Sequence, residues 1–436
     1  MKFRRRLLPA LALALATLGV AATSTAAPAG PAGSVPAAGT PALSSTDTNQ
    51  YIRQLVPCGS TMFAVGTITT ITQGGATYSR TGAFSFSATA PFTLTSWAPS
   101  IDGTVNSIGF LNGDCSSAYI GGKFTTVNGT AAQNLAKIST TTGAVDATFK
   151  HAATGEVQTV LGVDGHVFVG GLFKKVNNNT HPYYASLNPT TGNDDGYLNL
   201  GISGNYVYTG VKSNPTRVYN QQLSHSGNKL LVEGDFTNVA GQSRQQIFML
   251  DLGATSATLN PWNSTEFYVQ CDYIVPFYVQ DAAWSVNDQQ VFVATTGYKP
   301  ITLSTTAPRD GLCDAAAAFP ATGGNVSHSW INYTGCDSLY AVAADASTVY
   351  VGGHERWASN PGACDSKGPG AVVAPGMAGL STSDGGVIWN PGRARGKGAD
   401  DIVITDAGVW IGSDNDKNAN TCGGKSGFGG ICFMPY

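Results

Sequence analysis

The amino-acid sequence predicts an all-β protein, a β-propeller, on three observations. Short apolar runs that stop at glycine recur along the chain, a second phrase ending in a turn follows each of the clearer ones, and an aromatic residue stands near the end of most units. Repeats of about 50 residues that contain four short strands are typical of propeller blades. No amphipathic helix of useful length interrupts the repeats, which disfavours a barrel of alternating strands and helices.

The first repeated phrase is clearest in two copies. Residues 118–129 read AYIGGKFTTVNG and residues 167–178 read VFVGGLFKKVNN, while residues 231–241 hold the related LVEGDFTNVAG. Shorter or weaker copies stand at residues 62–66, 291–294, 349–353 and 409–412. A few apolar residues that end at glycine are typical of a short buried strand.

The second phrase supplies the next strand and a tight turn. Residues 135–143 read LAKISTTTG and residues 184–192 read YASLNPTTG, and Gly143 and Gly192 lie 49 residues apart, as do Gly121 and Gly170. Glycine permits the positive φ that such turns need. The aromatic residues near the unit ends are Trp97, Phe149, Trp262, Trp330 and Trp389. Each unit is therefore expected to hold an inner strand, a glycine-rich strand, a third strand, and a fourth that carries the aromatic residue.

The number of glycine-rich strands predicts seven four-stranded blades, with six as the alternative. These strands lie near Val65, Ile120, Val169, Val232, Val293, Val351 and Ile411. The last unit begins near Asp400 and has room for about three strands before Tyr436. We therefore expect residues 48–57 to supply or complete a strand there and close the ring.

The N-terminus predicts export. Basic residues at positions 2–6 precede an uncharged apolar stretch from Leu7 to Val20, and small residues suited to cleavage follow, which is the pattern of a secretory signal peptide. We assign residues 1–26 to this peptide, 27–48 to a disordered leader rich in Ala, Pro and Gly, and 49–436 to the propeller. The apolar stretch is too short to span a membrane, so we expect a secreted, extracellular protein.

Charge argues against a nucleic-acid partner. Charged residues make up only 12% of the chain and the net charge is −3. Loss of the signal peptide removes Lys2, Arg4, Arg5 and Arg6 and leaves −7. Nucleic-acid binders carry the opposite balance. We expect a monomer without a membrane span, whose partner is an extracellular glycan, a wall polymer or a protein.

The cysteines indicate disulfides. An even number in an exported chain favours disulfide bonds, and no Cys or His pair has the spacing of a zinc site. The eight are Cys58, Cys115, Cys271, Cys313, Cys336, Cys364, Cys422 and Cys432. Cys58 and Cys115 occupy equivalent turns of neighbouring units and are expected to pair. Cys422 and Cys432 lie within the last unit and are expected to pair there, and the other four stay unassigned.

The two phrases together resemble a known repeat. YIGGKFTTVNG followed by LAKISTTTG is similar to the delta-60-type repeat of bacterial secreted β-propeller proteins, a domain of unknown function. The resemblance is good over residues 104–192, fair over 231–252 and weak elsewhere. It implies a propeller fold and an exported protein, but it carries no catalytic residues that can be transferred.

Long loops mark one sector of the predicted ring as a candidate functional face. The loops after Gly297, Gly353 and Ser413 are long and hold cysteines, whereas those after Gly122 and Gly171 are short. Binding residues lie mostly on loops that a rigid scaffold positions. We hypothesise that this face carries the function of the protein. The alternative is that the loops vary in length without any functional reason.

Two motifs near the C-terminus are candidate sites. Arg393, Arg395 and Lys397 form a basic loop that could hold carboxylates or phosphates of a wall polymer. Asp414, Asp416 and Asn418 have the first oxygen spacings of a calcium loop, although Ala419 and Lys425 exclude a full EF-hand. A solvated basic loop and ordinary surface carboxylates are the alternatives. We expect no cofactor apart from this structural calcium.

Enzyme signatures are weak. His354-Glu355 begins like a zinc-protease motif but lacks the second histidine, and no nucleophile elbow occurs. A glycosidase needs two facing carboxylates, and Asp400-Asp401 at the start of an inner strand and Asp194-Asp195 in a loop are the candidates. The sequence thus favours a secreted propeller that binds or scaffolds a glycan, wall polymer or protein without catalysis. The alternatives are a polysaccharide hydrolase or lyase with carboxylates at the central well, and a structural spacer.

Overall fold

The computed structural model describes residues 30–45, 47, 49–205, 214–268, 271, 276–298, 311–415 and 421–436. The signal peptide predicted over residues 1–26 lies outside this part of the chain. Strands dominate the described residues, whose one helical element is a single 3₁₀ turn, η1 (Thr265–Phe267). None of their helices is long and apolar enough to cross a membrane.

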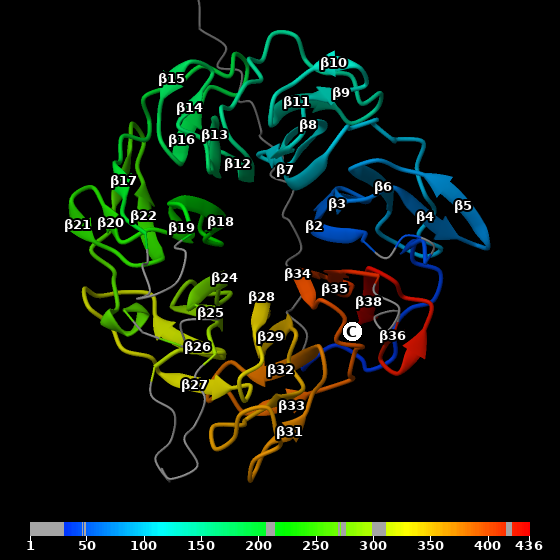
Figure 1. Cartoon of the computed structure of the whole chain (residues 1–436), viewed down its shortest axis with the longest axis vertical. Helices are drawn as coiled ribbons and strands as arrows, with labels where there is room; N and C mark the ends of the chain where they lie inside the picture. Colours follow the sequence, from blue (N-terminus) through cyan, green and yellow to red (C-terminus); the bar gives the residue numbers. More distant parts are fainter. Residues whose placement is uncertain are drawn as a thin grey trace, which may run out of the picture.

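The chain forms a ring of antiparallel sheets around a central space (Figure 1). The inner strands are β2 (Tyr51–Cys58), β7 (Thr104–Leu111), β12 (Val157–Val163), β18 (Arg217–Leu223), β24 (Tyr278–Trp284), β28 (Leu339–Ala344) and β34 (Ala399–Thr405). Each inner strand contacts the inner strands of the units before and after it, and β34 contacts β2, which closes the ring. The protein is therefore a β-propeller.

Each inner strand pairs with a second strand, which contains glycine in every unit but that of β25, and the second strand pairs with a third. The second strands are β3 (Thr61–Thr67), β8 (Asp114–Lys123), β13 (His166–Gly171), β19 (Lys229–Asp235), β25 (Gln290–Thr296), β29 (Thr348–Gly353) and β35 (Gly408–Ser413). The third strands are β6 (Ala83–Ser87), β11 (Leu135–Ser139), β16 (Tyr184–Leu187), β22 (Ile247–Leu252), β26 (Ala315–Pro320), β32 (Met377–Ser381) and β38 (Ile431–Pro435). Both repeated phrases thus form strands, as predicted.

A full fourth strand occurs in only part of the ring. The described fourth strands are β23 (Ala257–Leu259), β27 (Trp330–Tyr333) and β33 (Val387–Trp389). In other units a single bridge, such as Ile138 with Val145, takes the outer place. In that unit the bridge is followed by a turn, in which the Asp146 side chain accepts the Thr148 N–H at 2.9 Å. The prediction of four strands in every unit was therefore too regular.

Short hairpins stand in the loops between second and third strands. They are β4 (Thr70–Gln73) with β5 (Ala76–Ser79), β9 (Thr126–Val127) with β10 (Thr130–Ala131), β14 (Lys175–Val176) with β15 (Asn179–Thr180), β20 (Asn238–Val239) with β21 (Gln242–Ser243), β30 (Trp357–Ala358) with β31 (Val372–Val373), and β36 (Thr421–Cys422) with β37 (Lys425–Ser426). Two further strands join them, β1 (Ala42–Leu43) beside β4 and β17 (Ile202–Ser203) beside β20. The repeated Asn-Gly explains the tight turn, because Asn128 and Gly129 have φ of 50° and 75°.

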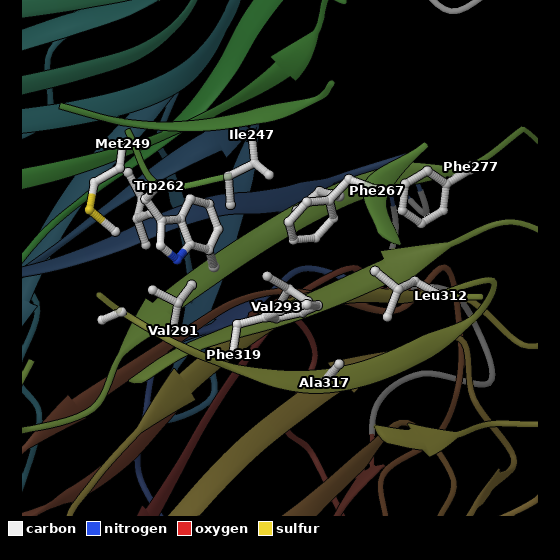
Figure 2. Close-up of a cluster of buried hydrophobic side chains, with 14 of the residues drawn as sticks. Ile247, Met249, Trp262, Phe267, Phe277, Val291, Val293, Leu312, Ala317 and Phe319 are labelled. Carbon is white, nitrogen blue, oxygen red and sulfur yellow. The ribbon is translucent and has the colours of Figure 1, made fainter. Parts of the chain in front are cut away.

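Apolar cores lie between neighbouring sheets. Figure 2 shows one of them, in which Ile247, Met249 and Trp262 of one unit face Val291 and other apolar residues of the next. Equivalent clusters join the other neighbouring sheets around the ring. Burial of apolar surface between sheets is the main favourable term in folding, so each unit depends on its neighbours for a core.

The predicted tryptophans also join neighbouring units. The indole N–H of Trp97 donates to the carbonyl of Ser139 at 3.0 Å, and that of Trp262 donates to Pro320 at 2.9 Å. Trp330 donates in the same way to Thr382. A buried indole needs a hydrogen-bond acceptor, and here the third strand of the next unit, or the turn that follows it, provides one.

Residues 30–45 differ from the flexible leader that the composition predicts. The N–H of Gly33 donates to Pro435 O at 2.7 Å and that of Ala37 to Phe433 O at 2.9 Å, so the segment runs along the outer edge of β38. We call residues 30–45 the strap. An edge strand offers unpaired backbone groups, which an extended segment can satisfy without an apolar pattern of its own.

The strap also changes how the ring is closed. Residues 51–58 form the inner strand of the first sheet, whereas we expected residues 48–57 to complete the last unit. The strap takes that place instead, and Leu43 continues it to the first unit by pairing with Ile71 and donating its N–H to Gly429 O.

All eight cysteines form disulfides, and no cysteine is free. The pairs are Cys58–Cys115, Cys271–Cys313, Cys336–Cys364 and Cys422–Cys432. The first and last are the two pairs that we expected.

Candidate functional site

Every inner strand carries a β-bulge near its start. The pairing with the second strand skips one residue at Arg53, Asn106, Gln158, Tyr219, Gln280, Tyr340 and Asp400. A bulge inserts one extra residue, bends the strand and re-aims a side chain, and bulges are frequent beside functional sites. The same irregularity at the same position of each unit points to the ring axis as the candidate site.

A cavity of about 330 Å³ lies where these bulges meet, and we call it the central well. Every inner strand contributes to its wall. The lining residues are Arg53, Gln54, Asn106, Ser107, Glu156, Gln158, Thr159, Arg217, Tyr219, Asn220, Gln222, Gln280, Asp281, Tyr340, Asp400 and Asp401. All of these side chains are polar or charged, so the well is suited to a hydrophilic ligand.

The second residue of each bulge mostly serves to join neighbouring units. Gln54 Oε1 accepts the N–H of Ile108 at 2.8 Å, and Ser107 Oγ accepts that of Val160 at 3.0 Å. Asp281 and Asp401 accept the N–H groups of Val342 and Leu55, and Thr159 accepts an N–H of the Gln221 side chain. Because each bond crosses to the next inner strand, these side chains stabilise the ring.

At two positions, Gln158 and Gln280, the first residue of the bulge is left for the well. The Oε1 atom of Gln158 is buried and has no hydrogen-bond partner within the described residues. No hydrogen bond of the Gln280 side chain is found in that part of the chain either. An unsatisfied buried polar atom costs free energy, so such groups in a native cavity call for a ligand or ordered water.

Charged groups in the well are held by specific partners. Arg53 and Asp400 form an ion pair at 2.8 Å, and the amide of Asn106 donates to Glu156 at 2.7 Å. Burial raises the pKa of Asp281 to about 7 and the pKa of Asp401 to about 8. Carboxyl groups with raised pKa values in a cavity are candidates for function.

The well opens at the same end of the ring as the long loops. Inner and second strands are antiparallel, so the start of each inner strand lies beside the end of its neighbour, as Leu339 beside Gly353 shows. Loops after the second strands, with the disulfides of Cys271, Cys336 and Cys422, therefore stand at this end. The Cys58–Cys115 bridge follows an inner strand and lies at the opposite end. A function for the long-loop face stays a prediction, and this face surrounds the end of the ring at which the well lies.

The basic loop is largely used in packing. Arg393 is buried, and its guanidinium donates to Ala394 O and Ser413 Oγ. Arg395 donates to His354 O at 2.8 Å and lies 3.3 Å from Asp337. Lys397 alone of the three is exposed. Two of the predicted ligand-binding residues thus hold the loop in place.

The calcium motif is only partly described. Asp414 is buried and accepts the backbone N–H of Lys397 at 2.9 Å, while Asp416 and Asn418 lie outside the described residues. Elsewhere in the described chain, no group of three or more His, Cys, Asp or Glu side chains is placed to hold a metal ion. A calcium site here stays a prediction.

The other carboxylate candidates lie away from the well. Asp194 and Asp195 pair with His181 and His166 at 2.6 and 2.7 Å. Glu355 is buried without a hydrogen-bond partner among the described residues, and burial raises its pKa to about 8. Only Asp400-Asp401 of the predicted pairs reaches the well.

The bulges have a repeated sequence pattern, which neither the composition nor the functional motifs indicate. Each inner strand begins with an aliphatic residue, two residues that are mostly polar, and then usually another aliphatic residue. Examples are residues 52–55 (IRQL), 105–108 (VNSI), 157–160 (VQTV) and 399–402 (ADDI). Two adjacent polar residues break the alternation expected of a half-buried strand, and the break recurs once per unit.

Comparisons with solved structures find β-propellers at low similarity. The structure resembles the WD40 β-propeller domain of Doa1 with a TM-score of 0.46 and 14% identity, over 89% of this chain and 95% of that domain. It resembles BamB from Moraxella catarrhalis with a TM-score of 0.39 and 13% identity, over 88% and 94%. The sequence matches no protein-family model and no curated protein. The delta-60-type resemblance therefore stays a prediction.

Proposed function

We propose that the protein is an exported, seven-bladed propeller that binds a hydroxylated extracellular ligand, a glycan or wall polymer, in its central well. The observation that carries the proposal is the set of aligned bulges, which turn polar side chains from every inner strand into one cavity. The Oε1 atom of Gln158 has no partner among the residues that the structure describes, and a ligand with many hydroxyls supplies both donors and acceptors.

The size of the well fits a small part of a polymer. Its volume of about 330 Å³ is at the lower end of the range of ligand sites, about 300–1,000 Å³. Tyr219 and Tyr340 add aromatic rings to a wall that is otherwise rich in amides. We infer that the well takes a chain end or a single unit, with the rest of the polymer on the long-loop face.

Separate observations support the seven blades and the export. Seven inner strands contact one another in sequence and close on themselves, and each pairs with a second strand of its own unit. The four disulfides fit an oxidising compartment outside the cell. The signal-peptide pattern over residues 1–26 supports the same location.

A glycan-binding screen tests the proposal. The secreted form, residues 27–436, is applied to an array of bacterial, plant and animal glycans, and hits are measured by titration calorimetry. We expect the double variant Gln158→Ala and Gln280→Ala to weaken binding at least tenfold, because it removes two polar groups from the well. Gln289→Ala, exposed in the turn between β24 and β25 at the opposite end of the ring, is the control. No hit at millimolar ligand, or equal binding by the well variant, would overturn the proposal.

A polysaccharide hydrolase or lyase is the second candidate, and one observation favours it. Asp281 and Asp401 line the same cavity with pKa values of about 7 and 8, which suits proton transfer. Their bonds to the N–H groups of Val342 and Leu55 favour a structural role instead. Release of new reducing ends from a bound glycan, lost in Asp401→Asn, would support this candidate over binding alone.

A further inference from the structure

The acidic side chains of the well have partners within the protein. Asp400 is paired with Arg53 at 2.8 Å, and Glu156 accepts the Asn106 amide at 2.7 Å. The donors to Asp281 are the amides of Asn220 and Gln222 and the N–H groups of Ala282 and Val342. Asp401 accepts the Leu55 N–H at 2.5 Å. These acids are therefore held by the ring itself.

Arg217 differs from every charged group named above. It is the first residue of β18 and lines the well, with its guanidinium carbon 5.3 Å from the centre of the Tyr219 ring. Its Nε atom is buried without a hydrogen-bond partner, and no carboxylate of the described chain forms an ion pair with it. Among the described residues, this cationic side chain of the cavity thus has no carboxylate in an ion pair with it.

We propose that the well recognises an acidic sugar through its carboxylate, which Arg217 binds, and this rests on the proposed function. Guanidinium binds carboxylate with two parallel hydrogen bonds and is suited to planar anions. Tyr219 holds the guanidinium against its ring, which limits the freedom that is lost on binding. The side-chain amides of Gln158 and Gln280 are then available to form hydrogen bonds with hydroxyl groups of the same sugar.

The charge of the well selects a single negative charge rather than a phosphate dianion. Glu156 and Asp400 lie in the same wall, and only Arg53 and Arg217 oppose them. Arg53 is paired with Asp400, so a ligand carboxylate bound by Arg217 leaves Glu156 as the one acid without a cation, and a second negative charge on the ligand would add to that excess. A uronic acid residue fits this limit better than a phosphate monoester does. The phosphodiester of a wall polymer also carries one charge, and the planar carboxylate, which can accept two parallel hydrogen bonds from Arg217, is what favours the uronate.

Carboxyl reduction gives a matched ligand control. Uronate-containing polysaccharides and the same polymers after reduction of their carboxyl groups to hydroxymethyl groups keep the same stereochemistry and differ in charge. Both sets are screened, together with neutral glycans and a teichoic-acid-type phosphate polymer, against the secreted form of the protein. We expect binding to at least one acidic polysaccharide, and at least tenfold weaker binding after reduction.

Variants locate the carboxylate contact. Arg217→Gln should weaken binding of the acidic hit at least tenfold and leave binding of its reduced form unchanged. Arg80→Gln is the matched control, because Arg80 lies 5.6 Å over the Tyr78 ring in the outer sheet, away from the well. Circular dichroism and thermal unfolding of each variant confirm that it is folded.

Four outcomes decide between the proposals. Loss of acidic-glycan binding in Arg217→Gln but not Arg80→Gln supports the inference. Hits that are all neutral and are lost in the Gln158 and Gln280 double variant overturn the acidic-sugar inference while leaving the proposed function intact. Binding of the phosphate polymer alone overturns it in favour of a phosphate site. No glycan hit of any kind overturns both.

Discussion

Leu43→Ala is the sharpest test of the strap. Leu43 is 3% exposed and packs in the apolar cluster between the last and first units, with Ile71 and Phe433 among its neighbours. The site is tight, because a Cβ added to Gly430 would lie 2.4 Å from Leu43 Cδ1. Truncation of a buried leucine costs about 2–5 kcal/mol, since the cavity adds to the lost transfer free energy. We therefore expect a loss of about that size.

A control variant in the same segment isolates the contact. Val35 is 62% exposed, so Val35→Ala should change the free energy of unfolding by no more than about 0.5 kcal/mol. Both variants are unfolded in urea at 25 °C and followed by tryptophan fluorescence and far-UV circular dichroism. The midpoint should fall for Leu43→Ala without a change in the slope of the transition.

A docked strap and a flexible leader predict opposite effects of Leu43→Ala on the free energy of unfolding. A flexible leader contributes nothing to stability, so Leu43→Ala would match both wild type and Val35→Ala. Equal midpoints for the three proteins would refute the docked strap, and with it the closure of the ring by this segment.

Three further changes test the ring itself. Burial raises the pKa of Asp401 to about 8, well above its value in an unfolded chain, so wild-type stability should fall as pH rises from about 4 to 8. Asp401→Asn should flatten that slope in urea titrations, and equal slopes would contradict the assignment. Replacing Cys58 and Cys115 together by serine removes a disulfide with a sequence separation of 57 and should lower the free energy of unfolding by about 2–4 kcal/mol under oxidising conditions. A variant as stable as the wild type under those conditions would contradict this. Gly170→Val should prevent folding or destabilise strongly, because its Cβ would lie 2.6 Å from Val218 Cγ1; a soluble variant with wild-type melting would count against the packing.

Much of the fold is readable from the sequence because the repeat is local. The glycines at 121 and 170 must lie against Val157 and Val218 of the next inner strand, where a Cβ would clash, so the phrase that contains them is restricted in sequence. The strap escaped prediction because it is bound through backbone hydrogen bonds, and the Ala, Pro and Gly composition of residues 30–45 carries no trace of them.

The site was harder to predict for a different reason. Sequence motifs report chemistry within single segments, and Arg393 and Arg395 are conspicuous there because basic residues are rare in this chain. Their positions are buried or paired, which only the fold shows. The well is assembled from one to four residues per unit, and Arg217 becomes distinctive only when the other charges of the ring have been assigned to partners.

The bulges explain how one strand position can serve both the ring and a ligand. Two successive side chains face the axis in most units, and the second is bonded across to the next strand, as Gln54 is to Ile108. At Gln158 and Gln280 the first makes no such bond among the described residues, so its identity can change there without opening the ring, whereas Asn106 and Tyr219 do bond to the next inner strand. At Ala341 the second position has no polar atom, and the ring there depends on apolar contacts between its units. Ligand specificity should therefore move with substitutions at the first bulge position and stability with those at the second, a separation that paired variants of Gln280 and Asp281 would measure directly.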